Sequence, residues 1–202
     1  QIKNLLMAII ACNESNLSIN KIIKVISKIK PVNGRLEKVG SLLDKSIVIL
    51  DFAHTPEALK KCLLSLREQF KFSNISIVFG CGGERDKQKR KTMGKIANEY
   101  CNKIYLTDDN PRNENPKKIR KDIMNGLKNS NAIEIGGRKK AIIYALKNSD
   151  PYEIILIAGK GHETYQDLGN KKIFLNDKKI VKEFINKKNF SINNKINNLR
   201  YN

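Results

Sequence analysis

Four short segments of this chain concentrate residues that could bind a charged ligand, and each segment follows an apolar run. The segments are residues 51–54, 80–90, 108–112 and 159–163. Both histidines of the chain, His54 and His162, lie in two of them. A single histidine is more often an ordinary surface or core residue, but two in glycine- or carboxylate-bearing segments favour a functional site.

The third segment places a carboxylate, an amide and a guanidinium around a rigid proline: Asp109, Asn110, Pro111 and Arg112. Arginine binds a carboxylate through two parallel hydrogen bonds, which the lysine ammonium cannot do. Glu163, in the fourth segment, could hold an ammonium group. Together these residues predict recognition of a zwitterionic amino-acid head group, and a surface turn with a salt bridge is the alternative.

The second segment is rich in glycine, with Gly80, Gly82 and Gly83 placed after a predicted strand and before a predicted helix. Glycines there would let the backbone approach a ligand, while Arg85 and Lys87 would supply charge. A merely flexible turn is the alternative interpretation. The spacing does not match G-x-G-x-x-G, and the sequence carries no P-loop pattern. An ATP-dependent activity would therefore need phosphate-binding residues from elsewhere.

Apolar periodicity predicts the elements that would position these segments. Strands are expected at residues 46–50, 75–79, 103–106, 132–135 and 153–158. Helices are expected at residues 2–11, 19–29, 56–70, 92–100, 116–127, 138–147 and 178–186. The repeated strand–loop–helix order predicts an α/β fold with a Rossmann-like, mostly parallel sheet flanked by helices. In such sheets ligands collect at the carboxyl ends of strands, where all four segments fall.

The chain is strongly basic, with 39 Lys and Arg against 20 Asp and Glu and a net charge of +19. Such a charge suits a polyanion, so a basic α/β nucleic-acid-binding module is an alternative. However, only eight of the 39 are Arg, and the Lys residues are spread along the chain beside many Asn and Ile. Because phosphate recognition more often uses clustered Arg, compositional drift is the favoured interpretation.

The four cysteines, at positions 12, 62, 81 and 101, form no C-x-x-C pair and no zinc-like cluster with histidine. We therefore expect reduced thiols, a cytoplasmic protein and no metal site in this chain. No apolar run approaches the roughly 20 residues of a membrane span, so no membrane association is expected. The chain begins Gln1-Ile2-Lys3 without an initiator Met, so we expect a piece of a longer protein.

Four motifs, in their order along the chain, resemble the C-terminal domain of the Mur ligases. They are D-F-A-H-T-P at 51–56, F-G-C-G-G-E-R-D-K at 79–87, D-N-P-R at 109–112 and G-K-G-H-E at 159–163, with Phe52 where the family has Tyr. Residues 1–38 are similar to the end of the family's central ATPase domain, including a hinge motif at 34–37. The resemblance implies an amino-acid-binding C-terminal domain at 39–186, followed by a frayed basic tail at 187–202.

Within this family, D-N-P-R is similar to the form that selects meso-diaminopimelate, whereas lysine-adding relatives carry other residues there. The resemblance implies substrate-binding roles for seven residues: Arg85, Asp109, Asn110, Pro111, Arg112, Gly159 and Glu163. Arg112 and Arg85 would bind the distal carboxylate of diaminopimelate, with Asn110 orienting it. Gly159 would supply backbone contacts, and Glu163 would contact the distal ammonium.

A second set of residues is implied to face a nucleotide: Asn4, Arg35, Asp51 and His54. The resemblance implies an ATP-dependent acid–amino-acid ligase that joins meso-2,6-diaminopimelate to UDP-MurNAc-L-Ala-D-Glu through an acyl phosphate in peptidoglycan synthesis. ATP and Mg²⁺ would be bound mainly by an upstream domain, so this chain alone should not turn over ATP, and its catalytic residues are not identified.

We expect small-molecule substrates, no nucleic-acid partner and a monomer. Two alternatives remain within the ligase interpretation. The chain could belong to a related Mur-type ligase that adds lysine or another amino acid. It could also be a non-catalytic remnant that docks to a partner chain carrying the ATPase.

Overall fold

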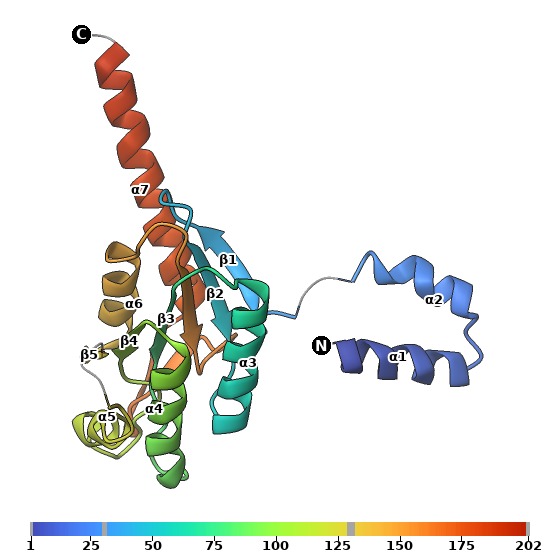
Figure 1. Ribbon diagram of the computed structural model, residues 1–202, viewed down its shortest axis with the longest axis horizontal. Helices are drawn as coiled ribbons and strands as arrows, with labels where there is room; N and C mark the ends of the chain where they lie inside the picture. The colour runs from blue at the N-terminus through green and yellow to red at the C-terminus, as the bar shows by residue number, and fades with distance from the viewer. Residues whose placement is uncertain (1, 30–31, 129–131, 201–202) are drawn as a thin grey trace. The chain divides into compact units, whose positions relative to one another are not determined.

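The computed structural model describes residues 2–29, 32–128 and 132–200, which fall into two units that divide between Val32 and Asn33 (Figure 1). The first unit is a pair of helices in contact, α1 (Ile2–Glu14) and α2 (Ile19–Ile26). Both predicted helices are confirmed, although α1 ends later and α2 ends earlier than expected. Pro31, the expected end of the second helix, lies outside the described residues.

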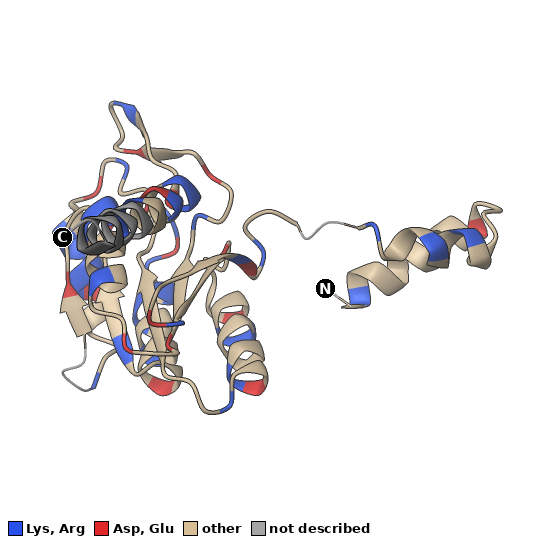
Figure 2. Ribbon diagram, turned by 90° about the horizontal axis from the view of Figure 1, so that it is seen from above, with Lys and Arg blue, Asp and Glu red and all other residues tan. Residues whose placement is uncertain are grey.

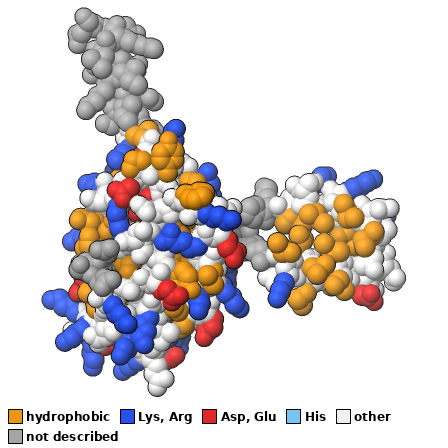
Figure 3. Space-filling view, in the orientation of Figure 1, with side chains coloured by type: hydrophobic (Ala, Val, Ile, Leu, Met, Phe, Trp, Pro, Cys, Tyr) orange, Lys and Arg blue, Asp and Glu red, His pale blue; other side chains and the backbone are white. Residues whose placement is uncertain are grey.

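The described part of the first unit presents many apolar side chains to its surface, as Figure 3 shows. Neither helix has a buried residue within the chain as described. The exposed apolar residues come from both helices and the segment that follows: Ile2, Leu6, Met7, Ile10, Leu17, Ile19, Ile23, Val25, Ile29 and Val32. Their assignment to the end of a central ATPase domain stays a prediction.

The division between the units differs from the predicted boundary at residue 38. Strand β1 (Glu37–Ser41) pairs antiparallel with β2 (Ile47–Asp51), which places it in the sheet unit. The preceding turn is attached as well, because Leu36 N–H donates to Asp51 Oδ2 over 2.8 Å. Residues 33–38 therefore belong to the second unit, since their backbone hydrogen bonds are made there.

The second unit contains a six-stranded sheet with the order β1-β2-β6-β3-β4-β5. Beyond β1 and β2, its strands are β3 (Ile75–Phe79), β4 (Lys103–Leu106), β5 (Ala132–Glu134) and β6 (Ile154–Ala158). All pairings except β1–β2 are parallel. This confirms the predicted α/β fold and its mostly parallel sheet. β1 and a small separate hairpin, β7 (Tyr165–Asp167) with β8 (Lys172–Phe174), were not predicted.

Helices cover both faces of the sheet (Figure 1). One layer consists of α3 (Pro56–Gln69), α4 (Gln88–Tyr100) and α5 (Pro116–Met124), and the other of α6 (Arg138–Lys147) and α7 (Asp177–Arg200). Because successive side chains of a strand point to opposite faces, Leu156 packs in the first layer and its neighbours Ile155 and Ile157 in the second. Strands buried on both faces explain the continuous apolar runs of the sequence.

The predicted frayed tail from residue 187 is wrong for the described backbone, because α7 continues as a helix to Arg200. Its first part is anchored by Ile180 and Val181, which are buried against the sheet. Once a helix is initiated, each added residue contributes a hydrogen bond without a new initiation cost, so an anchored helix can extend through an Asn- and Lys-rich sequence.

Charged residues of both signs are interspersed over the helices and loops of the second unit, whereas the described part of the first unit carries several Lys residues and a single acidic residue, Glu14 (Figure 2). None of the helices that the structure describes combines the length and apolarity needed to cross a bilayer.

Arg138 joins three elements of the second unit from the first turn of α6. Its guanidinium is fully buried and donates from Nε and Nη2 to Asp177, at the start of α7, over 3.0 and 2.7 Å. Nη2 also donates to the carbonyl oxygen of Ala158, the last residue of β6, over 2.9 Å. The pair therefore fixes the starts of two helices to the carboxyl end of a central strand.

Replacing Arg138 with Met should lower the free energy of unfolding by about 3–5 kcal/mol, because Asp177 would keep a buried charge without its partner. Urea unfolding of the chain measures this loss. Lys179→Met is the matched control, since Lys179 and Glu183 form an exposed pair 3.9 Å apart, worth about 0–1 kcal/mol. Equal losses in the two variants would contradict the role given to Arg138.

Candidate functional site

The carboxyl ends of β2, β3, β4 and β6 surround one cavity of about 680 Å³. Its lining includes seven of the residues singled out from the sequence: His54, Arg85, Asp109, Asn110, Arg112, Gly159 and Glu163. The structure thus brings together all four segments, which lie far apart in the chain. Pro111 and Asp51 are buried beside the cavity without lining it, and Asn4 lies on α1 in the other unit.

The glycine segment after β3 packs closely against the segment after β4. A Cβ at Gly83 would overlap the carbonyl oxygen of Pro111, and a Cβ at Gly80 would overlap that of Thr107. The Gly83 N–H donates to the Asn110 carbonyl over 2.9 Å. The expectation that these glycines serve a ligand is therefore incomplete. Gly80 lines the cavity, but both glycines are needed so that two backbones can touch.

Arg112 is held from three sides at the edge of the cavity. Its backbone is left-handed, with a φ of 50°, and its N–H donates to the Asp167 carbonyl over 3.1 Å. Its Nη1 donates to the Gly83 carbonyl over 2.7 Å, and its Nε lies 3.7 Å from Asp167 Oδ2. Asp167 belongs to the unpredicted hairpin, so β7 orients the arginine. The guanidinium is one-fifth exposed and faces the cavity lining.

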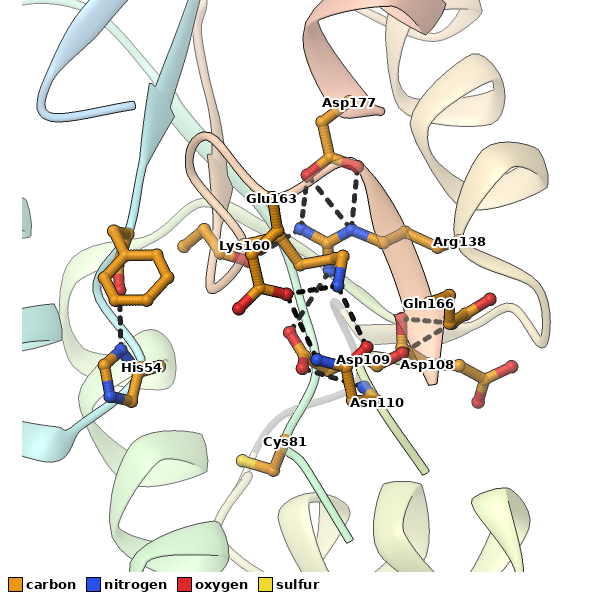
Figure 4. Close-up of polar contacts among 12 residues, drawn as sticks. His54, Cys81, Asp108, Asp109, Asn110, Arg138, Lys160, Glu163, Gln166 and Asp177 are labelled. Carbon is orange, nitrogen blue, oxygen red and sulfur yellow. Dashed lines mark hydrogen bonds and ion pairs between the residues drawn. The ribbon is translucent and has the colours of Figure 1, made fainter. Parts of the chain in front are cut away.

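Asn110, Lys160 and Glu163 form a hydrogen-bonded group beside this arginine (Figure 4). Asn110 Oδ1 accepts from Lys160 Nζ over 3.0 Å and from the Asp167 N–H over 2.9 Å. Asn110 Nδ2 donates to Glu163 Oε2 over 3.1 Å, and Lys160 Nζ lies 2.6 Å from the same oxygen. Lys160 is fully buried. Lys160 belongs to the G-K-G-H-E motif, but the sequence alone did not predict a role for it.

Glu163 is the negative group of the cavity. Burial disfavours its charged form, but the hydrogen bond and charge of Lys160, with smaller effects from Asn110 and Arg138, hold its pKa below the ordinary value. Glu163 is therefore an ionised hydrogen-bond acceptor at neutral pH. An ionised carboxylate on one side of a cavity and guanidinium groups on another suit a zwitterionic ligand.

Asp109 lines the cavity, but most of its contacts stabilise the loop at residues 108–112. Its Oδ1 accepts from the Asn110 N–H over 2.7 Å, and its carbonyl oxygen accepts from Gln166 Nε2 over 2.5 Å. Its Oδ2 is buried, has no hydrogen-bond partner among the described residues, and lies 4.0 Å from Arg138 Nη1. The Arg138 guanidinium thus offsets the negative charge of Asp109 at longer range and binds Asp177 directly, as Figure 4 shows.

The residues expected to face a nucleotide gather partly around Phe52. The guanidinium carbon of Arg35 lies 4.7 Å from the Phe52 ring centroid, and the His54 ring centroid lies at the same distance. His162, from the fourth segment, lies 5.5 Å away. Phe52 thus brings a cation and both histidines to one edge of the cavity, which Phe52 and His54 line. Their nucleotide-facing role stays a prediction.

Asp51 has a structural task at the end of β2. Its Oδ2 accepts from the Leu36 N–H and its Oδ1 from the Ala53 N–H, both over 2.8 Å. Burial raises its pKa, while these two backbone hydrogen bonds and the charge of Arg35 oppose that rise. Asp51 fastens the turn after residue 33 to the sheet, so its predicted approach to a nucleotide is not shown.

Arg90 is a buried support of the glycine segment that sequence reasoning missed. It is fully buried on α4, forms ion pairs of 3.0 Å with Glu114 and 2.9 Å with Asp122, and donates to the Gly82 carbonyl. Its place could have been found from spacing, because Arg90, Met93 and Ala97 recur at helical intervals on the buried face. Glu114 also accepts the Glu84 N–H, and its hydrogen bonds lower its pKa to about 2.

No group of three or more His, Cys, Asp or Glu among the described residues is placed to hold a metal ion. The four cysteines are free, and burial raises the pKa of Cys81, beneath the cavity, to about 12. Cys81 is therefore a protonated, unreactive thiol at neutral pH.

Comparison with known proteins identifies the family. A family model described as "Mur ligase, glutamate ligase domain" matches residues 34–161, and the chain belongs to the Mur ligase family. Relatives named UDP-N-acetylmuramoyl-L-alanyl-D-glutamate–2,6-diaminopimelate ligase are similar over most of the chain. The Rickettsia felis protein is 42% identical over 92% of this chain and 34% of its own length. The Buchnera aphidicola (subsp. Baizongia pistaciae) protein is 44% identical over 94% and 37%.

Solved structures agree with this placement. A structure titled as the same diaminopimelate ligase superposes with a TM-score of 0.72 at 32% identity, covering 93% of this chain and 38% of that one. A Thermotoga maritima UDP-N-acetylmuramate–alanine ligase superposes with a TM-score of 0.64 at 15% identity, which shows the shared fold. The chain thus spans a little over a third of the length of the relatives that it matches.

Gly83→Ala should lower the free energy of unfolding by about 1–3 kcal/mol, because the new methyl group would force two backbones apart. Gly82→Ala is the matched control, since the nearest atom to its Cβ would be the movable end of Arg112, 3.0 Å away, and its other neighbours lie at ordinary contact distances. Urea unfolding of both variants tests the difference. A Gly83→Ala chain as stable as Gly82→Ala would show that the two segments do not need their close contact.

Glu114→Gln should destabilise the chain at neutral pH by about 2–3 kcal/mol, because it removes the charge paired with Arg90. A carboxyl with a lowered pKa stabilises the fold above its unfolded-state value of about 4.5, and this contribution is lost as the pH falls toward about 2. The difference between wild type and variant should therefore shrink between pH 5 and pH 3 in urea unfolding. A difference independent of pH would refute the ion pair's contribution.

Proposed function

We propose that this chain supplies the amino-acid-binding domain of an ATP-dependent ligase that joins meso-2,6-diaminopimelate to UDP-MurNAc-L-Ala-D-Glu in peptidoglycan synthesis. The observation that carries the proposal is the cavity that Arg112 and Arg85 line together with the ionised Glu163. The names and similarity of the relatives support the same activity.

The charges of the cavity fit the chemistry of diaminopimelate. This amino acid is lysine with an additional carboxylate on the carbon that bears the distal ammonium. Arg112 and Arg85 offer donors to that carboxylate, and Glu163 offers an acceptor to the neighbouring ammonium. Lysine has no carboxylate to accept the remaining hydrogen bonds that these guanidinium groups can donate in a partly desolvated cavity. The missing charge-assisted bonds support a preference for diaminopimelate of several kcal/mol.

The proposed contribution of this domain to the reaction is to position the amine that attacks. ATP phosphorylates the terminal D-glutamyl carboxylate, the amine of diaminopimelate attacks the acyl phosphate, and phosphate leaves as the amide forms. Holding the far end of diaminopimelate at fixed groups raises the effective concentration of its near amine. We propose that ATP and Mg²⁺ are bound mainly by an upstream domain, with Asn4, Arg35 and His54 facing the nucleotide. Mg²⁺ would there neutralise charge on the transferring phosphoryl group.

We also propose a cytoplasmic monomer that works on small molecules. The interspersed charges of both signs in the second unit support this over a nucleic-acid-binding module (Figure 2). A nucleic-acid-binding chain would show a steep loss of affinity for duplex or single strands with added salt.

Arg112→Ala should weaken the binding of meso-diaminopimelate by about 10–100-fold and leave that of lysine nearly unchanged, because lysine lacks the distal carboxylate. Isothermal titration of the chain with each amino acid measures both affinities. Lys118→Ala, an exposed change on α5 away from the cavity, is the control for lost charge. Equal binding of the two amino acids by the wild-type chain would favour a ligase for another amino acid.

A further inference from the structure

Lys160 carries a buried charge whose partners all belong to the candidate site. Its side chain has no exposed surface, and its ammonium lies 2.6 Å from Glu163 Oε2 and 3.0 Å from Asn110 Oδ1. The ammonium also lies 5.5 Å from the centre of the Tyr165 ring. A buried ammonium is costly unless it is paired and hydrogen-bonded. The Lys160 ammonium therefore restricts the orientations of the Asn110 amide and the Glu163 carboxylate.

The first consequence concerns the orientation of the Asn110 amide. An ammonium group can only donate hydrogen bonds, so the atom of Asn110 that faces Lys160 must be the oxygen. The Asp167 N–H donates to that same oxygen, which independently fixes the assignment. Asn110 must therefore direct its NH₂ group toward Glu163. One N–H is used by Glu163, and the second is a donor for a ligand in the cavity that Asn110 lines.

The second consequence concerns Glu163. Among the described residues, the hydrogen bonds to its side chain from Lys160 and Asn110 both end on Oε2. This leaves Oε1 for a ligand, on a carboxylate that is one-quarter exposed. Because Lys160 also favours ionisation, the free oxygen belongs to a charged acceptor. One buried ammonium thus sets a donor on Asn110 beside an acceptor on Glu163.

We propose that Lys160 is a specificity-determining positioning residue: by fixing the Asn110 amide and the Glu163 carboxylate, it makes the cavity select a carbon that bears both a carboxylate and an ammonium. The inference rests on the proposed function and names the group that sets its selectivity. Without Lys160, Asn110 Oδ1 keeps the Asp167 N–H and Glu163 Oε2 keeps Asn110 Nδ2, but each group loses the ammonium that holds it, so both are held less firmly. A less firmly held Asn110 donor would bind the additional carboxylate of diaminopimelate more weakly, whereas the bare ammonium of lysine needs only the Glu163 acceptor.

The test is the selectivity of a Lys160→Met chain, expressed as the dissociation constant for lysine divided by that for meso-diaminopimelate. Isothermal titration of the full 202-residue chain gives both constants. The ratio should fall about tenfold or more. Lys172→Met is the matched control, because Lys172 also lies over the Tyr165 ring, 4.8 Å from its centre, but is exposed. That variant should keep the wild-type ratio.

A second readout separates positioning from mere support of the fold. The pKa of Glu163, followed by NMR of its labelled carboxyl carbon, should rise in Lys160→Met and stay unchanged in Lys172→Met, while urea unfolding confirms that both chains are folded. A folded Lys160→Met chain that keeps the wild-type ratio overturns the inference and leaves the proposed function intact. A wild-type chain that binds both amino acids equally overturns both.

If the Lys160→Met chain does not fold, Asn110→Asp decides the question. This change keeps a partner for Lys160 but replaces the NH₂ group with an acceptor oxygen, which removes the donor directly. Selectivity for diaminopimelate should again fall about tenfold or more. A folded Asn110→Asp chain with the wild-type ratio would overturn the proposed reason for selectivity, because the donor on Asn110 would then be irrelevant.

Discussion

The buried ion pair of Arg138 and Asp177 is the interaction on which the candidate site depends. It joins the first turns of α6 and α7 to the end of β6, next to the loop that carries Lys160 and Glu163. The same guanidinium lies 4.0 Å from Asp109, so the loop that carries Arg112 is stabilised from beneath. A charge pair in a protein interior is a doubtful source of net stability, because desolvation opposes it. Here the pair fixes positions, because the Arg138 guanidinium contacts the start of α7, the end of β6 and the Asp109 loop at the same time.

The loops around the cavity form a connected layer because their backbones touch. The Gly83 N–H donates to the Asn110 carbonyl and the Arg112 N–H to the Asp167 carbonyl, so two loops and β7 are linked through their main chains. The Gln166 side chain adds a hydrogen bond to the Asp109 carbonyl. Side chains directed into the cavity therefore start from a fixed frame. Holding an amine at a defined place needs such an arrangement. If the supporting loops moved, contacts at one end of a small molecule would no longer fix the position of its other end.

The sequence was informative where a property belongs to one segment. Apolar runs such as Ile75–Phe79 predicted the central strands, because these strands are buried on both faces. The motif residues were expected to meet because parallel strands end at the same edge. The sequence was uninformative where a residue's role depends on a partner that is distant in the chain. Arg90 and Arg138 find their carboxylates 24 and 39 residues away. Helical spacing places Arg90 on a buried face, but no local pattern predicts the partner of either arginine. The β7–β8 hairpin is short, largely exposed and polar, so it lacked a periodic pattern.

Arg112 adopts a left-handed backbone with a φ of 50°, a conformation that glycine or asparagine accepts at lower cost than arginine does. The hydrogen bond from its Nη1 to Gly83 offsets part of that cost. Backbone conformation alone would therefore favour glycine or asparagine at this position, and the proposed carboxylate contact is a reason for arginine there. If the proposed selection of diaminopimelate over lysine were no longer needed, replacing Arg112 with glycine or asparagine would relieve the backbone cost, so lost selection and local stability would both favour the replacement.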